Sequence, residues 1–589
     1  MAAAGAAVAG AFPAGTAEAR SGPADLIVHN GRVLTLDQHF RSAEAIAVRG
    51  GRVLAVGGAR EVKRLAGPRT QLLDAAGGTV LPGINDSHLH LSSFGLNRPP
   101  WTYDVDKATI DEVVEAVRAA VAQAPSPDSW IRGGGWQELK LPRAPRAADI
   151  DPVSGNHPVV LKDFSGHAIS VNSAVLRLAG ITRDTVPPVG GVIDKDADGE
   201  PTGVLRETAR NLVQSVIPAF SAAEVSQAID IGVGLLHAVG ITSLTEPGIG
   251  LDTLEIYRDK ARARRLPMRI TALLSGGMAP ATVRRILGGY RPAKDVDPRF
   301  VRVAGIKVYA DGIPRFHTSW MNQPYLDGTN GTMVIDGANP AEQIANLHEM
   351  IRLATDAGMQ VGTHATGDAT TDAVVAGYVK AGGPDLRHYV IHCNFPSAAT
   401  LRTMARHDIG ANLNAEILYL QGRVLESIIG PELTEYQWPY RSALNAGVRV
   451  ASGSDAPVVA PAWLRGVLAA TLREGAAGQV AGEAERITVR EALATYTSTS
   501  AWQDHAESWK GTLEPGKAAD ICMVGGDVLE VNPHELGTLP ITATVVDGRV
   551  VYERSSGARG TLADAAALTT SGCSHNGRCC CEVAEEIRG

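Results

Sequence analysis

Two histidines separated by one residue are the first side chains in this sequence that suggest chemistry. His88 and His90 follow an apolar run in the stretch LPGINDSHLHL. On an extended strand, residues two apart share a face, so both imidazoles would point the same way. Imidazole is the commonest metal ligand in proteins, and a catalytic zinc site needs three protein ligands and an open position for water. Because the chain has 16 histidines, such a pair also arises by chance, and the metal hypothesis therefore depends on further ligands.

Further candidate ligands fall at the ends of predicted strands. Eight short apolar runs alternate with helical segments, at 84–90, 241–246, 268–274, 303–310, 360–364, 389–392, 409–413 and 448–453. This alternation predicts parallel strands, and eight of them predict an α/β fold of the (β/α)8 barrel type. Four metal-compatible side chains lie at or near the ends of these runs: Lys307, His364, His392 and Asp455. Barrel enzymes carry their reactive groups at this face, so we expect these residues to meet the two histidines there.

Both ends of the chain are expected to build one small β-sandwich. Residues 24–80 show short strands with turns at Asn30-Gly31 and Gly50-Gly51, and residues 511–557 repeat the pattern with a turn at Asp547-Gly548. The barrel would occupy 81–510, but the interval of about 92–239 is too long for one connection. We interpret it as an insertion over the barrel mouth, either a substrate lid or a subdomain that does not move. Trp136 in this insertion would line the pocket or fill the insertion's own core.

The composition is that of an ordinary enzyme. Of the 589 residues, 44% are hydrophobic and 20% charged, and the net charge of -8 comes without basic tracts that would attract nucleic acid or anionic lipid. After the N-terminus, no apolar run is long enough to cross a bilayer. We therefore expect a small-molecule substrate, no nucleic acid and no membrane as partners, and leave homo-oligomer formation open.

The two termini differ from the rest of the chain. Residues 1–23 are rich in alanine and glycine, which fits a signal-peptide remnant or a disordered extension, so the protein would be exported or cytoplasmic. Cys393 and Cys522 lie inside the predicted fold, and four more cysteines crowd the tail of 558–589, at positions 573, 579, 580 and 581. So few cysteines do not form a disulfide framework. The tail could bind a soft metal or crosslink, but a flexible end without a structural role is the simpler interpretation.

Taken together, the motifs resemble the metal-dependent amidohydrolase superfamily, and within it amidohydrolase family 3, the branch that includes N-substituted formamide deformylases. The resemblance covers residues 25–554 and rests on the order and spacing of LPGINDSHLH, PVVLKDFSGHAISVNSAVL, GGVIDKDADGEPTGVL, GIKVYADG, THATGD, RHYVIHC, SGSDAPV and GTLEPGKAADICMV. Each motif alone is weak, but the series is specific. It implies a hydrolase that cleaves a non-peptide carbon–nitrogen bond, in an amide or formamide-like molecule, with a metal-activated hydroxide.

The resemblance also implies a divalent metal centre of one or two ions, which we expect to be Zn2+. His88 and His90 would hold the first ion together with Asp455, and His364 and His392 would hold the second. Metal-bound water has a pKa of about 7, which supplies hydroxide at neutral pH. Asp455 would take the proton and return it to the leaving nitrogen, as general base and then acid, or would act as a ligand only.

Lys307 would bridge two ions as a carbamate. An unmodified ammonium, with a reference pKa of about 10.4, has no lone pair for a metal, whereas burial and nearby cations lower that pKa and free the amine to react with carbon dioxide. The alternative is a plain lysine paired with Asp311 beside a single ion. His167, in FSGHAISVNS, matches a substrate-facing position of the family and could stabilise a developing oxyanion, or it packs within the insertion.

The sequence departs from the family pattern close to the proposed site. After Asp311-Gly312 the family usually has small residues and then Arg-Thr, where this chain reads IPRFHT; Thr366, Ala369 and Ile391 also differ. None of these changes removes a ligand, but all of them flank the site, so they put the substrate in question. The alternative functions are those of an esterase, a lactonase or a deaminase, or of a barrel protein that binds metal without catalysis.

Overall fold

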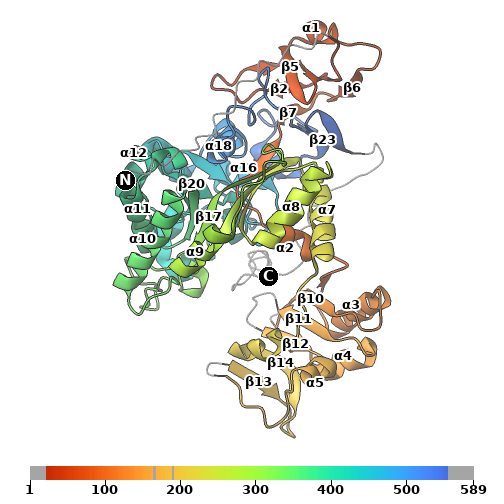
Figure 1. Cartoon of the computed structure of the whole chain (residues 1–589), viewed down its shortest axis with the longest axis vertical. Coiled ribbons are helices and arrows are strands. Elements are labelled where there is room, and N and C mark those ends of the chain that lie inside the picture. Colours follow the sequence, from red (N-terminus) through yellow and green to blue (C-terminus); the bar gives the residue numbers. More distant parts are fainter. Residues whose placement is uncertain (1–21, 139, 164–167, 189–190, 555–589) are drawn as a thin grey trace, which may run out of the picture.

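The computed structural model describes residues 22–138, 140–163, 168–188 and 191–554, which form a central barrel, a β-sandwich on one side of it and an inserted α/β unit on the other (Figure 1). Within these ranges, no helix combines the length and the apolarity that a membrane span requires.

Eight parallel strands form the barrel, each at a position predicted from the sequence. In chain order they are β8 (Ile84–Asp86), β15 (Ile241–Ile249), β16 (Arg269–Gly277), β17 (Val301–Tyr309), β18 (Gln360–Ala365), β19 (Tyr389–His392), β20 (Gly410–Leu413) and β21 (Val450–Ser452), and each pairs with the next. The first and last strands meet at their carboxyl ends, where Ser87 N donates to Ser452 O (3.1 Å) and Asp455 N donates to His88 O (2.7 Å). The predicted (β/α)8 barrel is thereby confirmed.

The first barrel strand is shorter than predicted. It ends at Asp86, so His88 and His90 lie in the irregular segment between β8 and helix α2 (Leu91–Leu96). The buried Asp86 carboxylate accepts hydrogen bonds from His88 N (3.2 Å) and from the backbone and hydroxyl of Ser454 (3.0 and 2.6 Å). These bonds turn the chain at the strand end. The expectation that strand pleating aligns the two imidazoles is therefore wrong, although the two side chains do lie together.

Helices pack around the barrel and against its ends. They include α8 (Leu251–Arg262), α9 (Pro280–Gly289), α10 (Pro340–Asp356), α11 (Asp368–Ala381), α12 (Ala398–Arg406), α13 (Ala415–Gln421), α14 (Glu426–Tyr436), α15 (Tyr440–Ala446), α16 (Trp463–Leu472), α17 (Val489–Thr495) and α18 (Ser498–Gln503). Helix α10 shows why they form. Asn339 caps its start by accepting from Glu342 N, and the buried Leu347, Met350, Ile351 and Ala354 recur at helical spacing on the side facing the strands.

The β-sandwich combines both ends of the chain, as predicted. One sheet contains β24 (Arg549–Glu553), β23 (Ile541–Val546), β22 (Ile521–Val524), β7 (Thr79–Pro82), β2 (Arg32–Leu34) and β3 (Ser42–Ala43); the other contains β5 (Arg52–Gly57), β4 (Ala45–Arg49), β1 (Leu26–His29) and β6 (Gln71–Asp74), with α1 (Ala59–Lys63) beside it. Strand β7 from the N-terminal part pairs antiparallel with β22 from the C-terminal part. Their shared core includes Val28, Ile46, Ile521 and Val545. Because β7 continues almost directly into β8, the sandwich adjoins the end of the barrel where the strands begin.

The insertion carries its own sheet, in the order β13 (Gly191–Lys195), β14 (Pro201–Glu207), β12 (Ala168–Val171), β11 (Val159–Asp163), β10 (Ile131–Trp136) and β9 (Tyr103–Asp104). Helices α3 (Ile110–Ala122), α4 (Ala147–Ser154), α5 (Ser173–Leu178) and α6 (Asn211–Gln214) accompany it. The insertion lies on the side of the barrel away from the sandwich (Figure 1), which is the side where the strands end. Trp136 is buried and donates from Nε1 to Leu161 O (3.0 Å), so it fills the insertion's core.

Two helices join the insertion to the barrel. Helix α2 leaves β8, and α7 (Ala222–Ala238) returns to β15. A Cβ atom on Gly95 of α2 would clash with the carbonyl of Ala228 in α7, so glycine permits the close approach of the two helices. Phe94 and Ile229 belong to the same apolar core as the barrel strands. The insertion is thus held through a packed helix pair rather than through a loose linker.

Candidate active site

Two imidazoles and one carboxylate converge between the first and last barrel strands. The Nε2 atoms of His88 and His90 each lie 3.2 Å from Oδ1 of Asp455. All three residues are buried, and their ligand atoms lie within 4.8 Å of one another. His90 N donates to Ala456 O (2.8 Å), and Asp455 N donates to His88 O (2.7 Å), so backbone hydrogen bonds hold the two segments together. Residues some 370 positions apart in the sequence therefore meet in one cluster.

The spacing of these atoms fits a metal ion. In a tetrahedral zinc site with bonds of about 2.0–2.1 Å, two ligand atoms are about 3.3 Å apart. The observed 3.2 Å between each imidazole nitrogen and the carboxylate oxygen agrees with that spacing. Two neutral imidazoles and one carboxylate also form a common ligand set for a catalytic divalent ion, with a coordination position left for water.

Two more histidines extend the cluster. The ring of His392 lies 5.4 Å from that of His88 and 4.6 Å from that of His364, measured between centroids, and His392 Nε2 is 3.9 Å from Asp455 Oδ2. Nε2 of His364 instead faces Gly312 O (3.0 Å) and Asp311 Oδ1 (3.6 Å).

Lys307 lies on β17 with a side chain that is 1% exposed. Burial lowers the pKa of Lys307 to about 7, although the charge of Asp455 acts in the opposite direction. Within the described ranges, Lys307 forms no ion pair, and Asp311 instead accepts hydrogen bonds from Thr366 N (3.1 Å) and Gly367 N (2.8 Å). The alternative pairing of Lys307 with Asp311 is therefore not found. A buried amine with a lowered pKa has the free lone pair that carbamate formation needs.

Protonation states in the cluster suit metal ligation. Burial lowers the pKa of His88 to about 3 and that of His392 well below its usual range. For Asp455, burial alone would raise the pKa, but the neighbouring His88 and His90 hold it well below the ordinary value. Neutral imidazoles beside an ionised carboxylate are the forms that bind a divalent cation.

Two polar residues that the sequence analysis missed hold this arrangement. Asp86 ties the segment of His88 to Ser454, next to Asp455, and Asn414 hydrogen-bonds to His392. The backbones of His392 and Asp455 are in the left-handed region, with φ of 70° and 61°, which costs energy that such bonds must offset. Asn414 directly follows β20, so the strand-end rule that selected the other residues could have found it.

Some sequence-based expectations fall outside the described residues. His167 belongs to 164–167, and the four cysteines of the tail belong to 555–589, so the structure does not place them. Cys393 and Cys522 are both buried, and they form no disulfide with each other.

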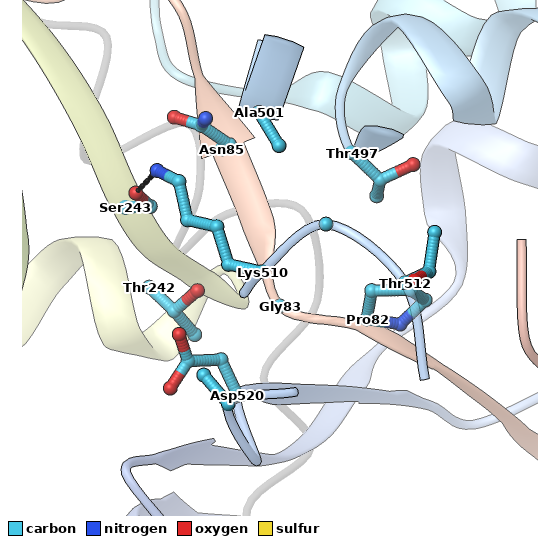
Figure 2. Close-up of a pocket in the computed structure, with 12 residues that line it drawn as sticks. Pro82, Gly83, Asn85, Thr242, Ser243, Thr497, Ala501, Lys510, Thr512 and Asp520 are labelled. Atoms are coloured by element: carbon cyan, nitrogen blue, oxygen red, sulfur yellow. Dashed lines mark hydrogen bonds between the residues drawn. The ribbon is translucent and has the colours of Figure 1, made fainter. Parts of the chain in front are cut away.

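An enclosed pocket lies at the opposite end of the barrel, where strands begin (Figure 2). Its lining includes Asn85 and Ser243 near the starts of β8 and β15, and Lys510, whose Nζ hydrogen-bonds to Ser243 Oγ. Lys510 Nζ also donates to Asp504 (2.7 Å), so this buried charge is already paired. Polar groups at the starting ends of barrel strands serve stability, so we do not assign this pocket to catalysis.

Comparisons with known proteins agree with the geometry. A family model described as "Amidohydrolase family" matches residues 71–552. The N-substituted formamide deformylase of Arthrobacter pascens is 31% identical over 564 residues, covering 90% of this chain and 99% of that protein. The amidohydrolase YtcJ of Bacillus subtilis (strain 168) is 29% identical over 544 residues, which cover 90% of this chain and 99% of that protein. A crystal structure of an uncharacterized metal-dependent hydrolase from Pyrococcus horikoshii OT3 superposes with a TM-score of 0.71 at 20% identity, covering 86% of this chain and 99% of that one.

Proposed function

Because this chain belongs to the amidohydrolase family and is therefore a hydrolase, we propose that it cleaves a non-peptide carbon–nitrogen bond in a small amide or formamide-like substrate. The resemblance inferred from the sequence motifs is confirmed at the level of the family. The observation that carries the proposal is the 3.2 Å approach of two buried imidazole nitrogens to one carboxylate oxygen. The relative named as a deformylase of N-substituted formamides supports the choice of substrate class.

The proposed metal ligands follow from this geometry. His88, His90 and Asp455 would hold the first divalent ion, which we propose to be Zn2+. His364 and His392 would hold a second ion, and Lys307, as a carbamate, would lie between the two. When bound, the metal supplies hydroxide at neutral pH and polarises the substrate carbonyl.

The protein's own residues would handle the proton. Asp455 is ionised and lies at the centre of the cluster, so its carboxylate oxygen can accept the proton of the attacking water. The same oxygen would then deliver that proton to the leaving nitrogen, which departs as a neutral amine. His167 is our proposed hydrogen-bond donor to the developing oxyanion.

Metal analysis combined with a substrate panel tests this proposal. The purified full chain should contain one or two equivalents of divalent metal by mass spectrometry. The panel should include N-substituted formamides, other acyl amides, esters, lactones and amino-heterocycles. We expect turnover of amides or formamides that is lost on chelation and restored by Zn2+. Preferred turnover of esters, lactones or amino-heterocycles would replace the amide assignment, and bound metal without any turnover would favour a binding protein.

A further inference from the structure

We propose that the hydroxyl of Tyr309 donates a hydrogen bond to the carbonyl oxygen of the bound substrate and is a catalytic residue of this site. The inference rests on the proposed function, because it concerns the same reaction. It adds to the metal ligands a group that stabilises the negative charge developing on the substrate oxygen.

The position of Tyr309 on its strand places its side chain inside the barrel. Tyr309 is the last residue of β17, two residues beyond Lys307, so the two side chains share one face of the strand. Nζ of Lys307 lies 5.1 Å from the centroid of the Tyr309 ring. Lys307 is buried close enough to Asp455 for their charges to interact. Tyr309 therefore lies inside the barrel, one step closer to the mouth than Lys307.

The ring of Tyr309 extends across the inside of the barrel. The centroids of the Tyr309 and His364 rings are 6.4 Å apart. The hydroxyl of Tyr309 points toward Gly248 on β15. It lies so close that a Cβ atom on Gly248 would clash with it. Strand β16 stands between β15 and β17 in the sheet, so the ring crosses the inner side of β16. The phenol thus spans from the histidine cluster across the inside of the barrel.

The hydroxyl of Tyr309 has no hydrogen-bond partner within the described residues. Tyr309 is only partly buried, and among the described residues its hydroxyl makes no hydrogen bond. Tyrosine hydroxyls inside proteins usually find a partner, as that of Tyr378 does with Thr363 Oγ1 (2.7 Å) and Tyr389 O (2.9 Å). An unpaired phenol at a barrel mouth is a donor available to a ligand. Such a donor strengthens its bond as the carbonyl oxygen gains negative charge, which lowers the reaction barrier.

The variant Tyr309→Phe tests the proposal, because it removes one oxygen atom and keeps the ring. We expect kcat to fall by about 10²- to 10³-fold while KM changes little. Metal content and thermal stability should match the wild type. Titration calorimetry with formate, whose oxygens are charged acceptors, provides a readout without turnover, and we expect about tenfold weaker binding to the variant.

The matched control is Tyr378→Phe. It also removes a tyrosine hydroxyl, but one that bonds within the barrel wall, so we expect lower thermal stability with unchanged kcat and formate affinity. If Tyr309→Phe keeps metal, kcat within twofold of the wild type and full formate affinity, the role of Tyr309 is refuted while the proposed function stands. If the wild type itself neither holds metal nor hydrolyses any amide, the proposed function fails, and the catalytic role of Tyr309 fails with it.

Discussion

Asn414 fixes the orientation of His392. Its Nδ2 donates to Gly453 O at 2.7 Å, which leaves Oδ1 to accept from His392 Nδ1, also at 2.7 Å. His392 therefore carries its hydrogen on Nδ1 and presents a lone pair on Nε2, the atom 3.9 Å from Asp455 Oδ2. One amide thus connects the end of β19 with the loop that carries Asp455, and it selects the tautomer that a metal requires.

Replacing Asn414 with alanine should weaken metal binding. Groups that orient a metal-binding histidine typically change affinity by about 10- to 100-fold, and chelator competition would measure the loss. The matched control is Asn412→Ala, two residues earlier and within β20. Asn412 is equally buried and donates to Ser87 Oγ (2.6 Å). Both variants should lose stability, but the Asn412 variant should keep its metal. Equal metal affinity in the two variants would contradict the role of Asn414.

Changing Asp455 to asparagine should abolish turnover while largely sparing the fold. The amide has nearly the same shape as the carboxylate but can neither accept the proton of water nor balance the charge of a metal ion. General acid–base groups contribute about 10²- to 10⁴-fold, so steady-state kinetics should show at least that loss. Circular dichroism would check that the variant is folded. Near-normal activity in a folded variant would refute the proton-transfer role.

Lys307→Ala should lose metal, and a short carboxylic acid should partly restore both metal and activity. The reason is that the truncated side chain leaves space beside Tyr309, where an added carboxylate can replace the oxygens of a carbamate. Metal content with and without acetate or propionate is the measurement. If the variant keeps two ions and the full rate, the bridging role of Lys307 is wrong.

The barrel strands could be predicted from the sequence because each strand is encoded by a continuous stretch of residues. Each barrel strand is a short apolar run, and residues such as His392 and Asp455 are recognisable because they lie close to the end of a run. The end of β8 could not be predicted in this way. It depends on the hydrogen bond between Asp86 and Ser454, which are 368 positions apart.

Side-chain direction was the other feature that the sequence could not provide. Whether Lys307 pairs with Asp311 depends on the loop after β18, where backbone amides of Thr366 and Gly367 occupy that carboxylate. The position of the Tyr309 hydroxyl likewise depends on a glycine, Gly248, on a strand that is not its neighbour. Such relationships involve three-dimensional neighbours, and no spacing in a single sequence encodes them.

The barrel should lose stability on acidification because of His388. Burial lowers the pKa of His388 to about 4, and its Nδ1 accepts a hydrogen bond from Val361 N (2.9 Å), which requires the neutral ring. In the unfolded chain the reference pKa is about 6.5. As the pH falls from 6.5 to 4, the unfolded chain therefore binds a proton that the folded protein does not. The contribution of His388 is complete above pH 6.5 and is lost progressively down to pH 4, by about 3 kcal/mol in all.

Urea unfolding at a series of pH values between 7.5 and 4 would measure this effect. His388→Gln keeps an acceptor for Val361 N but cannot titrate, so its free energy of unfolding should depend less on pH over that range. His39→Gln is the control, because His39 is exposed and its replacement should leave the slope of the wild type unchanged. A slope in the His388 variant equal to that of the wild type would show that this histidine is not the group whose protonation opposes folding.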